Sequence, residues 1–293
     1  MRTFEKFILD RIKRWVIVMG LSFTVSCAAV NQLNLLTPKD EVEIGRQASK
    51  EIEKEMPMLK DATVVAYIDS LGQAMVKASE LTMFEYHFNV VDTDDVNAFA
   101  LPGGYLYVNR GLIETADTEA ELAGVIGHEI GHVVGHHGAR QISKQYGLAV
   151  AVEVITGGGE NSSLARDIAS QFASFGAGLT LLKYGRLAEQ ESDAYAVQFT
   201  SKAGIHPEGA AQFFEKLLAL HENQPEGMEV WFTTHPPTQE RIDFVRQEIQ
   251  KLPTTVGLRM TSDRFEEIKA RVLAYKKNEP ISPKVPTEKR TLK

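Results

Sequence analysis

Apolar residues recur at helical spacing over most of the chain, beginning with a segment from Pro38 to Met56. Thr37 is a favourable N-cap for this segment and Pro38 suits a first helical turn. Pro57 ends the pattern, because proline cannot continue a helix. One face of the segment is apolar and consists of Val42, Ile44, Ala48, Ile52 and Met56. The pattern predicts an amphipathic helix.

The same spacing predicts further helices along the chain. They cover residues 62–79, a segment that starts at Thr118, and residues 186–203, 207–223, 238–250 and 262–276. Residues 141–183 are rich in Ala, Gly and Ser and include three consecutive glycines. This composition predicts two helices joined by a mobile loop.

Two short segments have the pattern of strands. Residues 84–91 alternate apolar and polar positions and are rich in aromatic side chains, and residues 105–109 follow a Pro-Gly-Gly turn at 102–104. We expect these two strands to form a hairpin-like edge. Helices and strands together predict an α+β fold that is mostly helical and has one small sheet.

The N-terminal segment has the pattern of a secretory signal. Basic residues at 11–14 precede an apolar run from Trp15 to Val25, which is shorter than the about 20 residues that a membrane-spanning helix needs. The run ends in Ser26 and Cys27, the only cysteine of the chain. This ending resembles a bacterial lipobox, which implies lipidation of Cys27. By the same resemblance, Ala28 favours sorting to the outer membrane.

The charge of the chain is unevenly placed. The first 26 residues carry a net charge of +3 and the whole chain carries −7, so the remainder carries −10. Phosphate binding needs a basic surface, so nucleic acid is not expected as a partner. The expected organisation is a signal peptide at 1–26, a tether at 27–37, a folded domain at 38–250, a C-terminal helix at 251–277 and a disordered tail at 278–293.

The helix that starts at Thr118 contains an H-E-x-x-H pattern, His128-Glu129-Ile130-Gly131-His132. Residues four apart share a helix face, so both imidazoles can reach one metal ion. Glu129 lies between them, where a carboxylate can accept a proton from an attacking water. The pattern predicts one Zn²⁺ per chain, with His128 and His132 as ligands and Glu129 as the general base.

The same helix is unusually rich in glycine. Each glycine lowers helix propensity by about 1 kcal/mol relative to alanine. We therefore expect another backbone to pack closely against one side of this helix. The glycines are Gly124, Gly127, Gly131 and Gly135.

A catalytic zinc needs a third protein ligand. His136 and His137 do not have the spacing of a further histidine ligand after His132, so a carboxylate from a later helix is expected. Glu189 and Asp193 are four residues apart on one helix face, and Glu191 points away from that face. One carboxylate can bind zinc while the other accepts a hydrogen bond from a ligating histidine. We favour Glu189 as the ligand.

Four blocks of the sequence resemble a known family of zinc metallopeptidases, which includes the CAAX prenyl endopeptidase, HtpX-like membrane proteases and BepA-like periplasmic proteases. The blocks are residues 97–104, 128–132, 186–193 and 234–241. Ser192 stands where the family motif has alanine. The resemblance implies a gluzincin, a zincin-like fold whose small sheet has an edge strand beside the zinc cleft. That strand is formed by Asn97, Ala98, Phe99 and Ala100.

The resemblance also implies residue roles and a setting. His128, His132 and Glu189 bind zinc, Glu129 is the base, and Asp193 supports His128. Extended polypeptides would bind by adding a strand to the exposed edge, which suits unfolded or misassembled proteins of the bacterial envelope. No apolar run long enough to span a membrane follows Cys27, so the lipid-anchored or soluble periplasmic members are the expected relatives.

Two residues of the last block are candidates for stabilising the oxyanion of the reaction, His235 and Arg241. His235 precedes two prolines, which form a stiff connector rather than a helix. It could donate to the oxyanion, or it could close the zinc site as a fourth ligand while no substrate is bound. A packing role is the third possibility, and the sequence leaves the choice open.

Two other functions are compatible with these patterns. A chaperone-like holdase would keep zinc and rarely cleave, with the segment 141–183 as a cap over the cleft. A scaffold lipoprotein would use its helices as an interaction surface. Zinc content separates the scaffold from the other two functions, and peptide hydrolysis separates the protease from the holdase.

Overall fold

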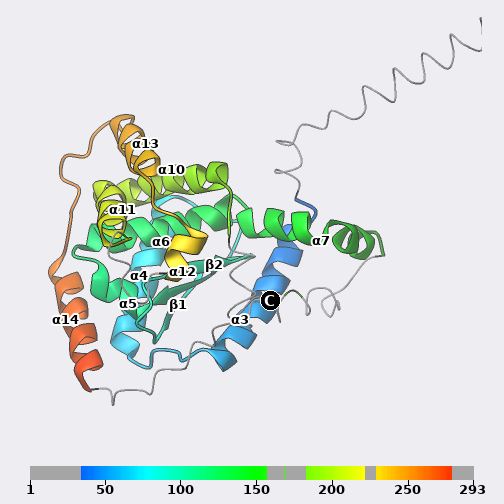
Figure 1. Ribbon diagram of the computed structural model, residues 1–293, viewed down its shortest axis with the longest axis horizontal. Helices are drawn as coiled ribbons and strands as arrows, with labels where there is room; N and C mark the ends of the chain where they lie inside the picture. The colour runs from blue at the N-terminus through cyan, green and yellow to red at the C-terminus, as the bar shows by residue number, and fades with distance from the viewer. Residues whose placement is uncertain (1–33, 157–167, 169–182, 222–228, 279–293) are drawn as a thin grey trace, which may run out of the picture.

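A computed structural model describes residues 34–156, Ile168, 183–221 and 229–278 (Figure 1). The helices are α3 (Pro38–Glu55), α4 (Ala62–Ala78), α5 (Arg110–Thr115), α6 (Glu119–Val134), α7 (His137–Thr156), α10 (Arg186–Lys202), α11 (Glu208–His221), α12 (Glu229–Thr234), α13 (Gln239–Gln250) and α14 (Asp263–Asn278). The strands are β1 (His87–Val91), β2 (Ala98–Leu101) and β3 (Tyr105–Asn109). The expected α+β class, mostly helical with one small sheet, is confirmed.

Several predicted segments fall outside the described residues. These are the signal peptide with Cys27, most of the segment between 157 and 182, and the tail from residue 279. The described end of the predicted tether packs against the domain, because the Leu35 N–H donates to Ser143 Oγ of α7 at 2.9 Å. Among the described helices, none is both long and apolar enough to cross a membrane.

The expected helix starts are present. Thr37 and Asp40 form a capping box at α3, in which each side chain accepts a hydrogen bond from the other residue's backbone N–H. Thr118 caps α6 by accepting from the Glu121 N–H. The short helices α5 and α12 were not expected, because six residues are too few to display a helical period.

The pairing of the sheet differs from the expected hairpin. The strand order is β1–β3–β2, with β1 parallel to β3 and β2 antiparallel to β3. The turn at residues 102–104 therefore connects β3 to β2, and not to the strand at 84–91. All four β2 residues are buried, so this strand lacks the alternation that would have indicated it from periodicity.

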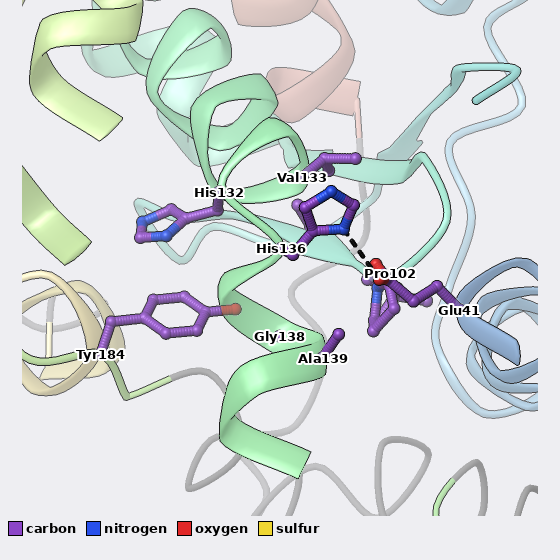
Figure 2. Close-up of a pocket in the computed structure, with 10 residues that line it drawn as sticks. Glu41, Pro102, His132, Val133, His136, Gly138, Ala139 and Tyr184 are labelled. Atoms are coloured by element: carbon purple, nitrogen blue, oxygen red, sulfur yellow. Dashed lines mark hydrogen bonds and ion pairs between the residues drawn. The ribbon is translucent and has the colours of Figure 1, made fainter. Parts of the chain in front are cut away.

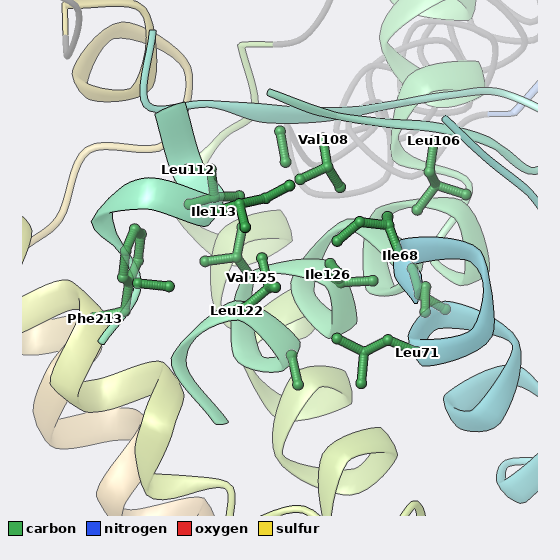
Figure 3. Close-up of a cluster of buried hydrophobic side chains, with 14 of the residues drawn as sticks. Ile68, Leu71, Leu106, Val108, Leu112, Ile113, Leu122, Val125, Ile126 and Phe213 are labelled. Carbon is green, nitrogen blue, oxygen red and sulfur yellow. The ribbon is translucent and has the colours of Figure 1, made fainter. Parts of the chain in front are cut away.

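Helix α6 lies between the sheet on one side and helices α10 and α11 on the other (Figure 1). Its apolar side chains meet α4, α5 and the strands in one core (Figure 3). Labelled members of this core are Ile68, Leu71, Leu106, Val108, Leu112, Ile113, Leu122, Val125, Ile126 and Phe213. Helix α14 joins the same core through Phe265, Ile268 and Val272. All sides of α6 are thus covered by protein.

Close helix packing explains Gly124, Gly127 and Gly131, as expected from the sequence, whereas Gly135 faces the side chain of His137. A Cβ atom at Gly124 would lie 2.7 Å from the Cα of Ala210 in α11. A Cβ atom at Gly131 would lie 2.9 Å from the Cα of Ser192 in α10. Because the obstacles are backbone atoms, no side chain could move aside. The absent Cβ atoms bring α10 close to the face of α6 that carries the H-E-x-x-H pattern.

Candidate metal centre

Four buried side chains direct donor atoms toward one point. His128 and His132 come from α6, Glu189 from α10, and His235 from the residue after α12. Each offers one donor atom, and these atoms all lie within 4.8 Å of one another. Imidazole nitrogen and carboxylate oxygen are donors that zinc accepts, so the group can hold one zinc ion. The expected cofactor, one zinc per chain, is confirmed.

The histidines of α6 present their Nε2 atoms to this centre. His128 Nε2 lies 3.5 Å from Glu189 Oε2, and His132 Nε2 lies 3.5 Å from Glu189 Oε1. His128 Nδ1, on the far side of the ring, lies 2.8 Å from Asp193 Oδ1. The structure therefore brings Asp193 to the position from which it can hold the His128 ring.

Glu189 is a buried carboxylate in a positively charged setting. Burial by itself would raise its pKa, but His235 and Arg241 outweigh this effect and hold the pKa well below its usual range. His235 Nδ1 lies 3.1 Å from Glu189 Oε1, and Arg241 Nη1 lies 2.9 Å from Glu189 Oε2. An ionised Glu189 is the form that a metal requires.

Glu129 has a different environment. It is buried on α6, and its Oε1 atom has no hydrogen-bond partner among the described residues. His235 faces it, with Nε2 3.6 Å from Glu129 Oε1. Burial raises the pKa of Glu129. A carboxylate oxygen that accepts no hydrogen bond and lies next to the metal ligands can accept a proton from a reacting molecule.

Arg241 is enclosed by acceptors. Its Nε donates to Asp193 Oδ2 at 2.8 Å and its Nη2 to Asp193 Oδ1 at 2.7 Å. Its Nη1 contacts Glu189 and donates to the Pro236 carbonyl at 3.3 Å. The guanidinium also lies over the Phe214 ring, 4.4 Å from its centroid. These contacts orient Arg241 toward Asp193 and Glu189, which is the geometry of a positioning residue.

The strand expected to bind substrate is at an edge of the sheet but is not exposed. Within the described part of the chain β2 pairs with β3 alone, and Asn97, Ala98, Phe99 and Ala100 are each more than nine-tenths buried. The expectation of an exposed edge is therefore wrong for this conformation.

A small pocket lies between β2 and the junction of α6 with α7 (Figure 2). Its wall includes Tyr184, whose ring stacks on His132 with centroids 4.1 Å apart. His136 also lines the pocket, but its Nδ1 faces Glu41 Oε1 of α3 at 2.8 Å, so it turns away from the metal centre. The pocket places apolar surface from Leu101 and Pro102 beside the ligand His132.

The sequence did not indicate four residues around the centre, three of which contact a ligand and one of which, Glu191, contacts it through His137. Tyr184 stacks on His132, and the Trp231 ring lies 5.1 Å from the His235 ring. His137 Nδ1 lies 2.8 Å from His132 Nδ1, and Glu191 contacts His137 in turn. Of these four residues, only His137 stood out in the sequence, as part of the adjacent pair His136–His137. Its spacing from His132 did not show that the two rings are in contact.

Several known proteins are similar in sequence to this chain. The chain is 29% identical over 239 residues to the beta-barrel assembly-enhancing protease of Escherichia coli, which covers 80% of this chain and 48% of that protein. It is 33% identical over 164 residues to metalloprotease YcaL of Escherichia coli, covering 56% of this chain and 62% of that protein. The mitochondrial metalloendopeptidase OMA1 of Schizosaccharomyces pombe is 27% identical over 234 residues, 78% of this chain and 65% of that protein. The chain thus spans about half the length of the beta-barrel assembly-enhancing proteases that it matches.

The family comparison covers the whole site. Residues 63–249 match the family described as Peptidase family M48. This range is more than half of the chain and contains the four metal-binding candidates, Glu129, Asp193 and Arg241. The family expected from the sequence blocks is therefore confirmed: the chain belongs to peptidase family M48.

Proposed function

We propose that the protein is a zinc-dependent endopeptidase whose substrates are polypeptides. The observation that carries this proposal is the buried group of His128, His132 and Glu189 beside the Glu129 carboxylate oxygen that accepts no hydrogen bond. When bound, zinc would polarise the scissile carbonyl and lower the pKa of a water molecule toward 7. A site that only stabilises the fold has no use for a buried carboxylate oxygen that accepts no hydrogen bond at that position.

Each residue of the site would then have a distinct role. His128, His132 and Glu189 hold the metal, and Asp193 and Arg241 fix the orientation of His128 and Glu189. Glu129 accepts a proton from the attacking water at Oε1 and returns it to the leaving amine. β2 and the adjoining pocket would receive an extended substrate, with main-chain hydrogen bonds giving sequence-tolerant binding.

We further propose that this conformation is a resting state closed by His235. His235 Nδ1 lies 3.4 Å from His128 Nε2 and is one of the four donors that can share the metal. Four protein ligands leave no open position for substrate, whereas catalysis needs one.

Hydrolysis of casein by the full chain tests the proposed activity. We expect slow cleavage that stops when a chelator removes the metal and returns when zinc is restored. Cleavage that persists without metal would contradict the proposal.

The proposed setting is the periplasm of a bacterial envelope, with quality control of unfolded or misassembled proteins as the role. The support is the signal-like N-terminus together with relatives that are named for assembly of β-barrel proteins. The lipobox-like ending at Cys27 supports a lipid anchor, most simply in the outer membrane.

A Cys27→Ala variant tests the anchor. We expect the variant to leave the membrane fraction while the folded domain stays intact, because several acyl chains anchor a protein stably and their loss removes that anchor. The measurement is the distribution of the protein between washed membranes and the soluble fraction, with Ser26→Ala as a control that keeps the cysteine. A Cys27→Ala variant that stays on the membrane would mean that another contact holds it there.

A further inference from the structure

The chain reverses sharply between α6 and α7, directly after the second metal-binding histidine. His136 adopts a left-handed conformation with φ of 53°, which is uncommon for a residue with a side chain. The reversal places the His137 ring over Gly135, where a Cβ atom would lie 2.5 Å from His137 Nε2. Glycine at 135 therefore makes room for this ring.

The two adjacent histidines then face opposite ways. His136 points to Glu41 (Figure 2). His137 is buried, and its Nδ1 lies 2.8 Å from Nδ1 of His132. On the other side of the ring, His137 Nε2 lies 3.1 Å from Oε2 of Glu191 in α10. A continuous path of close polar contacts thus leads from His132 through His137 to a carboxylate that is 41% exposed.

The positions of the hydrogen atoms follow from the chemistry of imidazole. A His132 that binds metal through Nε2 carries its hydrogen on Nδ1, which must then donate. Its neighbour at 2.8 Å, His137 Nδ1, must accept, so His137 carries its own hydrogen on Nε2. That N–H faces Glu191, which accepts it. Each contact has one donor and one acceptor, so the chain of contacts is self-consistent.

We propose that His137 and Glu191 are positioning residues that fix the tautomer and orientation of His132 for metal binding. The inference rests on the proposed zinc site and extends it. Helix α10 then supports both histidines of α6, His128 directly through Asp193 and His132 through Glu191 and His137. The same helix supplies the ligand Glu189. The close packing of α10 against the glycines of α6 therefore determines where Glu189 and the residues that support both histidines lie.

Ser192 adds a contact that belongs to this chain's own sequence. Its Oγ lies 3.3 Å from His137 Nδ1, at the position where the related motif has alanine. This contact is longer than the 2.8 Å contact between His132 Nδ1 and His137 Nδ1. It is therefore an auxiliary contact, and Ser192→Ala is expected to change zinc affinity less than His137→Ala does.

The test measures zinc affinity by chelator competition and the visible absorption spectrum of the Co²⁺-substituted full chain. Removal of a group that orients a metal ligand typically lowers affinity by about 10–100-fold, and we expect this loss for His137→Ala, with an altered Co²⁺ spectrum. His137→Asn should recover most of the affinity, because the asparagine Oδ1 occupies the place of Nδ1 and can accept from His132. Circular dichroism of each metal-free variant establishes that it is folded.

The contribution of Glu191 is measured in a double-mutant cycle. Glu191→Ala should weaken zinc binding in the wild-type background and have no further effect in His137→Ala, because it acts through that ring. Glu240→Ala is the matched control, since Glu240 is an exposed carboxylate that contacts α10 only through Arg186 and Gln190.

The outcomes separate this inference from the proposed function. Wild-type zinc affinity and an unchanged Co²⁺ spectrum in His137→Ala would overturn the positioning role alone. An Asn variant as weak as the Ala variant would overturn the assignment of His137 as acceptor. A wild-type chain that binds no zinc would overturn the proposed function and this inference together.

Discussion

A Glu129→Gln variant of the full chain is expected to hydrolyse casein about 10²–10⁴-fold more slowly than the wild type, because this is the usual contribution of a general acid–base group to the rate. Glutamine keeps the shape of the side chain but cannot accept the proton. The metal ligands are untouched, so zinc content should stay at the wild-type value. The measurement is the initial rate of hydrolysis together with the zinc content of the same sample.

The control for this variant is Glu240→Gln, which removes an exposed carboxylate at a distance from the ligands. Loss of zinc together with activity would show that Glu129 is itself a ligand. Equal rates for the wild type and Glu129→Gln would remove the catalytic role of Glu129. The absence of hydrolysis by both zinc-loaded proteins would favour a zinc-containing holdase.

His235→Ala is expected to raise the basal rate of hydrolysis. If the open state is populated at about 10%, removal of the fourth ligand raises the rate by about tenfold. Zinc should remain, because His128, His132 and Glu189 still hold it. Self-cleavage should increase in parallel, and both are measured on freshly purified protein.

If His235 instead stabilises the oxyanion, the rate of hydrolysis in His235→Ala should fall rather than rise. An oxyanion donor, once removed, typically lowers the rate by about 10²–10³-fold. A fall of that size would contradict the resting-state interpretation and assign His235 to catalysis. Unchanged activity would leave it as a residue that packs against Trp231.

Much of the metal centre could be predicted because its signals are local. His128, Glu129 and His132 lie within one helical turn, and the spacing of Glu189 and Asp193 places both carboxylates on one face of α10. The glycines of α6 indicated that another backbone packs closely against this helix, and the structure shows that it is the backbone of α10 and α11. These features depend on helical periodicity, which a sequence displays directly.

The remaining features depend on chain direction and on contacts between distant segments. The parallel pairing of β1 with β3 has no local marker, and β2 is too short and too uniformly buried to show alternation. His137 reaches His132 only because His136 adopts positive φ, a conformation that nothing in its neighbours specifies. The enclosure of Arg241 by Asp193 and Glu189 likewise requires α13 to pack on α10.

Titration of the metal-free full chain with Zn²⁺ tests the central claim most directly. We expect casein hydrolysis to rise in proportion to added zinc and to level off at one equivalent per chain, while Glu129→Gln takes up the same equivalent and stays inactive. Activity in the absence of zinc, or activity in zinc-loaded Glu129→Gln equal to that of the wild type, would contradict the account.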